Sequence, residues 1–286
     1  MNSIALVLPG AGAKGAYYEG VIQAIEKLEI PISKIYGASI GAIEGACYAL
    51  GWPDHAREDL WYEMGNNFDS LAKSSLIRAL FFNHFSSLKS DWKLKNWIQD
   101  KFNFNFLSTK IPISISVADL RTGDSLTIDS GSMANALMAS TALPPALSPH
   151  KFLYRESREI WGADGGLNNN IMLETAYNDQ YRTIILPLIG KFKEMSKRDL
   201  RSWIKILFRA LAIKTRQEVY SEVDWFKTTF KDVNLIVIEP SDLNINEQSA
   251  LDFDPSFITK AINCGYRDAM RELPTHLGKL VAKKPQ

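Results

Sequence analysis

The fold of this 286-residue chain is decided by residues 4–15, Ile4-Ala5-Leu6-Val7-Leu8-Pro9-Gly10-Ala11-Gly12-Ala13-Lys14-Gly15. Residues 4–8 form a continuous apolar run that ends at a proline and a glycine, which is typical of a buried parallel strand. After the glycine-rich turn, apolar residues recur at helical spacing, at Val21, Ile22, Ile25 and Leu28. A strand, a glycine turn and a helix in this order predict the start of a βαβ unit.

The same order repeats in the residues that follow. Lys34 to Ala38 is predicted to be a second strand and Ile40 to Leu50 a second helix, which Gly51-Trp52-Pro53 ends. Two such units imply right-handed crossovers between parallel strands. We therefore expect an α/β fold with a mostly parallel central sheet flanked by helices.

The rest of the chain extends this plan. Residues 54–101 have a helical, aromatic pattern and form a helical insertion. Further strands are predicted at 111–117, 125–128, 158–163, 183–189 and 233–238, and helices at 132–140, 199–219 and 255–271. No repeat or linker is visible, so residues 4–175 and residues 176–286 are expected to complete one α/β domain.

The composition excludes several classes of protein. With 46% hydrophobic and 23% charged residues the chain is globular, and its net charge of +1 gives no reason to expect a nucleic-acid partner. Cys47 and Cys264 are far apart and the four histidines lack ligand spacing, so neither a metal site nor a cofactor is expected. The N-terminal apolar run stops after six residues, which favours a cytoplasmic protein, with export without a signal peptide left open.

The first glycine motif, Gly10-Ala11-Gly12-Ala13-Lys14-Gly15, matches the G-x-G-x-x-G of dinucleotide-binding proteins. Such a site needs an acidic residue about 20 positions later, at the end of the second strand. Here that strand ends without an acid, so a dinucleotide-binding oxidoreductase is disfavoured. The same backbone amides could instead hold a developing oxyanion, and a tight turn without a ligand is the remaining alternative.

The second motif, Gly37-Ala38-Ser39-Ile40-Gly41, is a G-x-S-x-G between a predicted strand and a predicted helix. A nucleophilic serine in such an elbow occupies a strained turn where flanking side chains would collide. Ser39 would stand at the helix N-terminus, and the Ile40 amide could donate to an oxyanion. A serine that only caps the helix is the alternative.

A nucleophilic serine needs a base, and no histidine fits this role well. The charged run Asp54-His55-Ala56-Arg57-Glu58 is interpreted as a solvated helix face, His84 lies in the aromatic segment, and His276 lies in the C-terminal tail. His150 follows Pro149 in a predicted loop and remains the one histidine considered as a possible base. Asp164-Gly165-Gly166 offers a carboxylate after a predicted strand, although an isolated Asp-Gly-Gly is usually only a turn.

Together and in this order, the three motifs resemble the patatin-like phospholipase family, which is related to the α/β-hydrolases. The resemblance covers residues 4–175 and extends to Gly20-Val21-Ile22, Ala139-Ser140-Thr141-Ala142-Leu143-Pro144 and Asn170. It implies a lipid acyl hydrolase of the phospholipase A or lysophospholipase type, in which Ser39 is the nucleophile and Asp164 the base, without histidine or metal. It also implies that backbone amides of Gly10 to Gly12 hold the oxyanion and that Lys14 anchors their loop.

This sequence departs from the family pattern at three positions. Ala11 replaces a glycine, Ala38 a frequent threonine and Met172 a frequent proline. A Cβ at position 11 is tolerated only if the backbone φ angle there is negative. The same pair of residues would serve a thioesterase or transacylase, because water and other alcohols compete for one acyl-enzyme, and a non-catalytic lipid-binding protein is a further alternative.

Two segments are candidates for contact with the lipid. Residues 198–216 predict an amphipathic helix with one basic arc, a pattern also typical of helices that bind membrane surfaces. The arc is formed by Arg198, Arg201, Lys205, Arg209 and Arg216. Packing of the opposite, apolar side on the sheet is the preferred interpretation, and it is compatible with peripheral membrane contact if the basic arc alone meets anionic headgroups. The aromatic segment Leu76 to Trp97 is expected to form part of an acyl pocket wall, with a lid or a plain helical core as alternatives.

Overall fold

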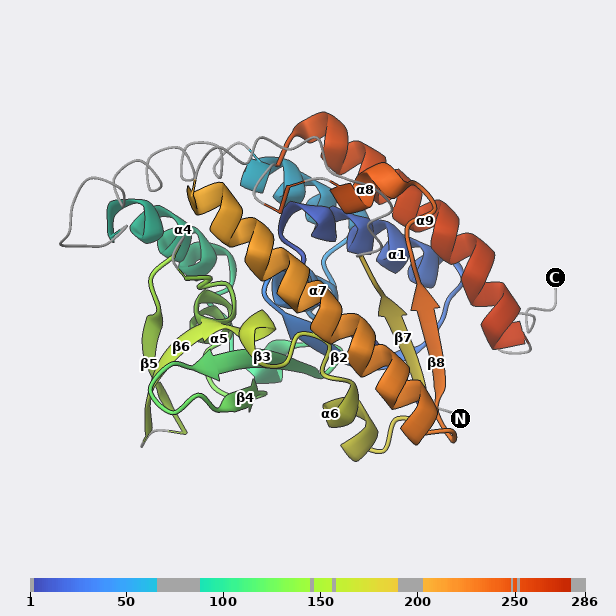
Figure 1. The fold of residues 1–286 in the computed structure, drawn as a ribbon, viewed down its shortest axis with the longest axis horizontal. Coiled ribbons are helices and arrows are strands. Elements are labelled where there is room, and N and C mark those ends of the chain that lie inside the picture. Colours follow the sequence, from blue (N-terminus) through green and yellow to red (C-terminus); the bar gives the residue numbers. More distant parts are fainter. Residues whose placement is uncertain are drawn as a thin grey trace.

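An eight-stranded sheet forms the centre of the molecule, in the order β5-β6-β3-β2-β1-β7-β8 with β4 beside β3 (Figure 1). The computed structural model describes residues 3–65, 88–144, 147–155, 158–189, 203–247, 249–250 and 253–278. The strands are β1 (Ile4–Leu8), β2 (Ile32–Ala38), β3 (Ile113–Asp119), β4 (Ser125–Ile128), β5 (His150–Tyr154), β6 (Arg158–Asp164), β7 (Thr183–Pro187) and β8 (Asn234–Ile238).

The helices lie on the two faces of this sheet. They are α1 (Ala16–Lys27), α2 (Ile40–Leu50), α4 (Leu88–Lys101), α5 (Met133–Ser140), α6 (Leu173–Asn178), α7 (Trp203–Thr229), α8 (Leu243–Glu247) and α9 (Pro255–Leu277). Residues 54–65 are also helical. Figure 1 shows α6 and α7 on one face of the sheet and α1 and α9 on the other.

The predicted mostly parallel sheet is confirmed. Strands β3, β2, β1, β7 and β8 pair in parallel, and β4, β5 and β6 join in antiparallel pairs at the β3 side. The parallel pairing follows from the helices between successive strands, because a crossover returns the chain in the same direction. β7 and β8 belong to the same sheet as β1, so the C-terminal residues extend the sheet that the N-terminal residues begin.

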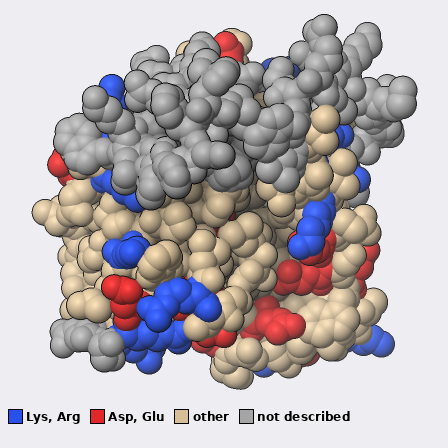
Figure 2. Space-filling view, turned by 60° about the vertical axis from the view of Figure 1, so that its left-hand side comes forward, with Lys and Arg blue, Asp and Glu red and all other residues tan. Residues whose placement is uncertain are grey.

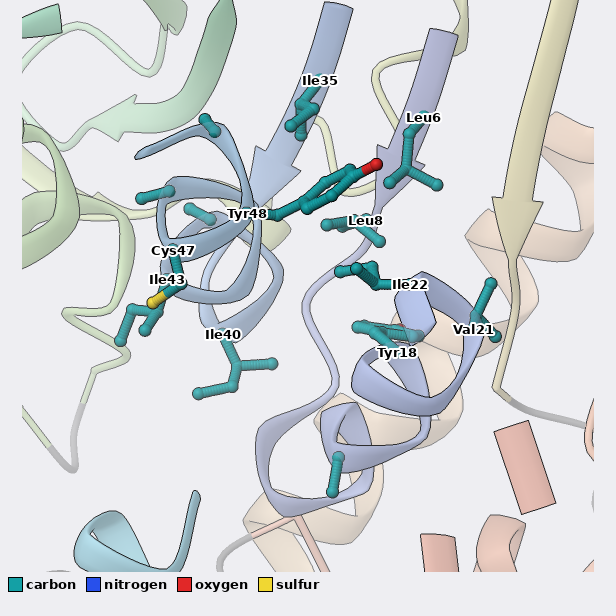
Figure 3. Close-up of a cluster of buried hydrophobic side chains, with 14 of the residues drawn as sticks. Leu6, Leu8, Tyr18, Val21, Ile22, Ile35, Ile40, Ile43, Cys47 and Tyr48 are labelled. Atoms are coloured by element: carbon teal, nitrogen blue, oxygen red, sulfur yellow. The ribbon is translucent and has the colours of Figure 1, made fainter. Parts of the chain in front are cut away.

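Alternate residues of β1 enter two different cores. Ile4, Leu6 and Leu8 belong to the larger core, and Ala5 and Val7 to the smaller one. In the larger core, the side chains of β1 lie among those of α1 and α2, as Figure 3 shows for Leu6, Leu8, Ile22 and Tyr48. The continuous apolar run is thus the signature of a strand that is covered on both faces.

Three sequence predictions need correction. His150 does not lie in a loop but begins β5, whose register with β6 pairs it with Gly162. His276 lies in the last turn of α9 rather than in a tail. Arg57, assigned to a solvated face, is completely buried, whereas its neighbour His55 is exposed as predicted.

The buried Arg57 joins α1, α2 and helical residues 54–65. Its guanidinium contacts the Glu19 carboxylate at 2.8 Å and that of Glu26 at 2.7 Å. Glu44, also buried, accepts a hydrogen bond of 2.6 Å from Trp61 Nε1. Burial, and then the nearby Glu44, raise the pKa of Glu19, and the Arg57 cation lowers it by stabilising the ionised form. This cluster fixes the two helices that follow the glycine loop and the Ser39 turn.

Candidate active site

Ser39 stands at the turn between β2 and α2. Its backbone has φ 53° and ψ −126°, a conformation that non-glycine residues rarely adopt and that is typical of strained functional turns. A Cβ added to Gly37 would lie 2.6 Å from the Ala42 Cα. A Cβ added to Gly41 would lie 2.1 Å from the Leu8 carbonyl oxygen. Both glycines are therefore required by the close approach of the backbone on either side of Ser39.

The Ser39 hydroxyl contacts Asp164 directly. Ser39 Oγ donates a hydrogen bond of 2.5 Å to Asp164 Oδ2 across 125 residues of sequence. β3 pairs with both β2 and β6, and it thereby brings the end of β6, where Asp164 lies, next to the end of β2. The second carboxylate oxygen, Oδ1, accepts a hydrogen bond of 2.8 Å from the Gly166 N–H. The residues predicted as nucleophile and base thus lie together.

The surroundings of Asp164 alter its acidity. The residue is only 4% exposed. Burial raises the pKa of its carboxyl from 3.8 to about 6, while the hydrogen bonds from Ser39 and Gly166 lower it. A carboxylate with this pKa is still ionised at neutral pH and is a stronger base than an exposed aspartate. It can therefore accept the proton of the hydroxyl that it contacts.

The glycine-rich loop packs beside Ser39. Gly12 has φ 58°, and a Cβ there would lie 2.1 Å from the Ala250 carbonyl oxygen. The same oxygen accepts a hydrogen bond of 2.8 Å from the Ala13 N–H. Ala11 has φ −146°, so its side chain is accommodated without backbone strain.

The loop amides differ in their partners. The Gly10 N–H donates to Asn170 Oδ1 at 2.8 Å. Ala11 directly precedes η1 (Gly12–Gly15) and Gly12 is its first residue, so neither N–H group has an acceptor within it. Neither donates to any residue that the structure describes. Of the three amides predicted to hold an oxyanion, that of Gly10 is thus already engaged.

The space above two loop glycines is filled by the protein itself. In a dinucleotide site the second glycine of the motif lets the pyrophosphate approach the backbone. Here the Ala250 carbonyl occupies that space at Gly12, and the Asn170 side chain occupies it at Gly10. This packing is a further argument against a dinucleotide-binding site.

The last residue of α5 contacts Ser39, and the segment just after α5 contacts Asp164. The Ser39 N–H donates to Ser140 Oγ at 2.9 Å, and the Asp164 N–H donates to the Ala142 carbonyl oxygen at 3.0 Å. From the sequence, residues 139–144 were noted only as part of the family resemblance, and no role was assigned to them. The hydrogen bonds join residues that are distant in sequence, so local patterns cannot reveal them.

The histidines that the structure describes do not contact this pair. His150 Nε2 lies 3.0 Å from Asn135 Oδ1, and its ring stacks on Phe152. Burial, and then the Lys95 charge, lower the pKa of His150 to about 4. His276 lies 3.8 Å from Glu272 on α9, and His84 lies outside the described residues. The sequence left His150 as a second candidate for the catalytic base. Its position beside Asn135 and Phe152 does not support that role.

An apolar pocket adjoins the end of α5. It is lined by Leu94, Lys95, Ile98, Met138, Thr141, Ala142, Leu147 and Ser148. Ala142 is shared between this pocket and the backbone contact to Asp164. The aromatic segment Leu76 to Trp97, predicted as a pocket wall, contributes Leu94 and Lys95. Residues 76–87 and the side chains of residues 88–92 lie outside the described part.

The predicted membrane-binding helix is described in part. Residues 198–202 precede α7 and, like the Lys205 side chain, are not described. Lys214 is exposed and pairs with Glu218 at 3.2 Å, whereas Arg209 and Arg216 are half-buried. The later residues Val219, Val223 and Phe226 pack in the smaller core. Membrane contact through this helix remains a prediction.

Charges of both signs are intermixed on the coloured part of the surface in Figure 2. Arg158, for example, pairs with Asp124 at 3.1 Å. Among the described residues, no helix is sufficiently long and apolar to cross a membrane. Within the same ranges, no three histidine, cysteine or acidic side chains are grouped so that they could hold a metal ion.

Comparison with known proteins identifies relatives. The model of the patatin-like phospholipase family matches residues 6–177. A patatin-like phospholipase domain-containing protein of Caenorhabditis elegans is 28% identical over 206 residues, which are 69% of this chain and 14% of that protein. An "uncharacterized NTE family protein" of Mycobacterium tuberculosis is 30% identical over 173 residues, 59% of this chain and 27% of that protein. The chain thus matches a minor part of the length of these relatives.

The fold is also found in a solved structure. The crystal structure of VipD from Legionella pneumophila superimposes with a TM-score of 0.51 and 14% identity, covering 96% of this chain and 67% of VipD. At this identity the similarity concerns the fold alone. The family model, in contrast, spans more than half of the sequence. This protein therefore belongs to the patatin-like phospholipase family.

Proposed function

We propose that this protein is a lipid acyl hydrolase that cleaves carboxylic esters of phospholipids or lysophospholipids through an acyl-enzyme on Ser39. The observation that carries the proposal is the 2.5 Å hydrogen bond from Ser39 Oγ to the buried carboxylate of Asp164. A serine hydroxyl is a weak nucleophile until a base accepts its proton. Asp164 is the group in hydrogen-bonding position to do so, and its raised pKa favours the transfer.

The reaction takes two steps. As Asp164 accepts the proton, Ser39 Oγ bonds to the ester carbonyl carbon, and the carbonyl oxygen becomes an oxyanion. When this tetrahedral intermediate collapses, the bond to the alcohol breaks and the alcohol leaves with the proton from Asp164. Water then gives a proton to Asp164 and attacks the acyl group, which releases the fatty acid and returns the proton to Ser39.

The oxyanion needs donors that are in place before the reaction. The N–H groups of Ala11 and Gly12 are suited to this role because they lack an acceptor in the described part of the chain. The Ile40 N–H, at the first position of α2, also has no acceptor within its helix. The apolar side chains beside Ala142, such as Met138 and Leu147, are proposed to contact the acyl chain.

The proposal is tested with a fluorophosphonate, which forms a bond from phosphorus to the attacking serine oxygen and releases fluoride. Wild-type protein should be labelled at Ser39, as read by mass spectrometry of the modified peptide, and should hydrolyse a short-chain nitrophenyl ester. Ser39→Ala and Asp164→Asn should lose both signals, whereas Ser125→Ala, at an exposed position of β4, should retain them. Folded wild-type protein that is neither labelled nor active would contradict the proposal.

A further inference from the structure

Asn170 lies where the three sequence motifs meet. Its Oδ1 atom accepts the Gly10 N–H at 2.8 Å. It also lies 3.0 Å from the position of a Cβ on Gly166. A Cβ on Gly10 would in turn lie 3.0 Å from Ser39 Cβ. One amide side chain is therefore in contact with the glycine loop, next to Ser39, and with the turn that carries Asp164.

We infer that Asn170 is a positioning residue that decides which amides of the glycine loop can bind an oxyanion. This inference rests on the proposed function. By accepting the Gly10 N–H, Asn170 removes that donor and fixes the start of the loop 160 residues away in sequence. The next two amides, of Ala11 and Gly12, are left as the loop's donors.

Asn170 is held in place by burial and by hydrogen bonds on either side of it. The residue is 9% exposed, and a buried amide oxygen is seldom left without a donor. Its turn is held by Asn169 Oδ1, which accepts the Met172 N–H at 2.9 Å. From the other side, the loop is held by the Ala250 carbonyl through the Ala13 N–H. The amides of Ala11 and Gly12 thus lie between two fixed points, and loss of one would free the loop to move.

The consequence for catalysis follows from geometry. Oxyanion donors act only within hydrogen-bonding distance of the oxygen on which charge develops, and a displacement of about 1 Å can lower a rate by about 100-fold. Loss of the Asn170 amide should therefore lower kcat and leave KM nearly unchanged. A residue that only stabilised the fold would change the unfolding temperature without this selective effect on kcat.

Asn168, two positions before Asn170, provides a matched control. Asn168 is exposed and donates through Nδ2 to the Gly123 carbonyl oxygen at 2.8 Å, away from the glycine loop. We would compare Asn170→Ala and Asn168→Ala in ester hydrolysis, in the rate of fluorophosphonate labelling and in thermal unfolding. Asn170→Ala should lower kcat and the labelling rate on the order of 100-fold, with KM within about twofold. Asn168→Ala should match the wild type.

A second variant separates the effect of the loop position from the effect of a charge at residue 170. Asn170→Asp keeps an acceptor for the Gly10 N–H but places a negative charge beside Asp164 and the oxyanion. It should therefore lower kcat and also shift the pH dependence of activity to higher pH, because a nearby like charge raises the pKa of Asp164. Equal kcat values in wild type and Asn170→Ala, or an equal loss in Asn168→Ala, would overturn the inference.

Hydrogen exchange at the Gly10 amide provides a test that does not need turnover. The exchange should be slow in wild type and Asn168→Ala and faster in Asn170→Ala. An unchanged exchange rate in Asn170→Ala would overturn the proposed anchor even if the activity fell. If wild type lacked labelling at Ser39 but Gly10 exchange still depended on Asn170, the proposed function would fail while the anchor itself stood.

Discussion

The pH dependence of activity is the most direct consequence of the Ser39–Asp164 contact. The carboxylate form of Asp164 is the base, so kcat/KM should rise with pH and level off above the pKa of about 6 that burial produces. Below this pKa, kcat/KM should fall tenfold per pH unit, to about one-tenth of its plateau value at pH 5 and about one-hundredth at pH 4. An aspartate with the ordinary pKa of 3.8 would be almost fully ionised at pH 5.

The assay is hydrolysis of a neutral short-chain ester between pH 4 and pH 8, with the fluorophosphonate labelling rate measured in parallel. A histidine base would give a similar inflection, so the profile is repeated at several temperatures. Ionisation of a carboxyl group has little enthalpy and that of imidazole has more, so an inflection from Asp164 should hardly move. The profile of His150→Gln should equal that of the wild type. A flat profile down to pH 4.5, or an inflection that moves with temperature as imidazole does, would refute the reasoning.

Three other predictions concern stability and packing. Asp164→Asn should abolish activity yet stabilise the fold by up to about 3 kcal/mol at pH 7, because the raised pKa makes the ionised form costly. In urea unfolding this gain should shrink as the pH falls from about 6 to below 4, and an equal gain at every pH would contradict it. Arg57→Met should lower the free energy of unfolding by about 3–5 kcal/mol because it leaves buried acids without a cation. Arg121→Met, in an exposed pair, should lower it by less than about 1 kcal/mol. Equal losses of stability in the two variants would argue against the buried cluster. Gly41→Ala should lower the labelling rate on the order of 100-fold or prevent folding, because its Cβ would meet the Leu8 carbonyl, and normal labelling would disprove this close packing.

The structure also explains the sequence predictions that failed. β5 was missed because it is short and lies at the edge of the sheet, where its side chains alternate between half-buried and exposed positions. The Arg57 segment was assigned to solvent because its local composition is charged. Its burial depends on carboxylates that arrive from α1 and α2, and no property of residues 54–58 alone predicts that contact.

The sequence alone determined the parallel sheet and the Ser39 turn, because these follow from local causes. An apolar run predicts a strand covered on both faces, and two glycines around a serine predict a tight turn between strand and helix. The sequence also singled out Asp164, although only through the resemblance of the three motifs to a family.

Only the tertiary structure decided how these parts meet. The contact of Ser39 with Asp164 and the hydrogen bond from the Gly10 amide to Asn170 each join residues more than 100 positions apart. The raised pKa of the Asp164 carboxyl follows from its burial in the folded chain. Hydrogen bonds and burial depend on distance in space, and the pairing of β3 with both β2 and β6 sets that distance. The sequence therefore identifies the residues of the candidate site, and the pairing of the strands brings them close enough to react.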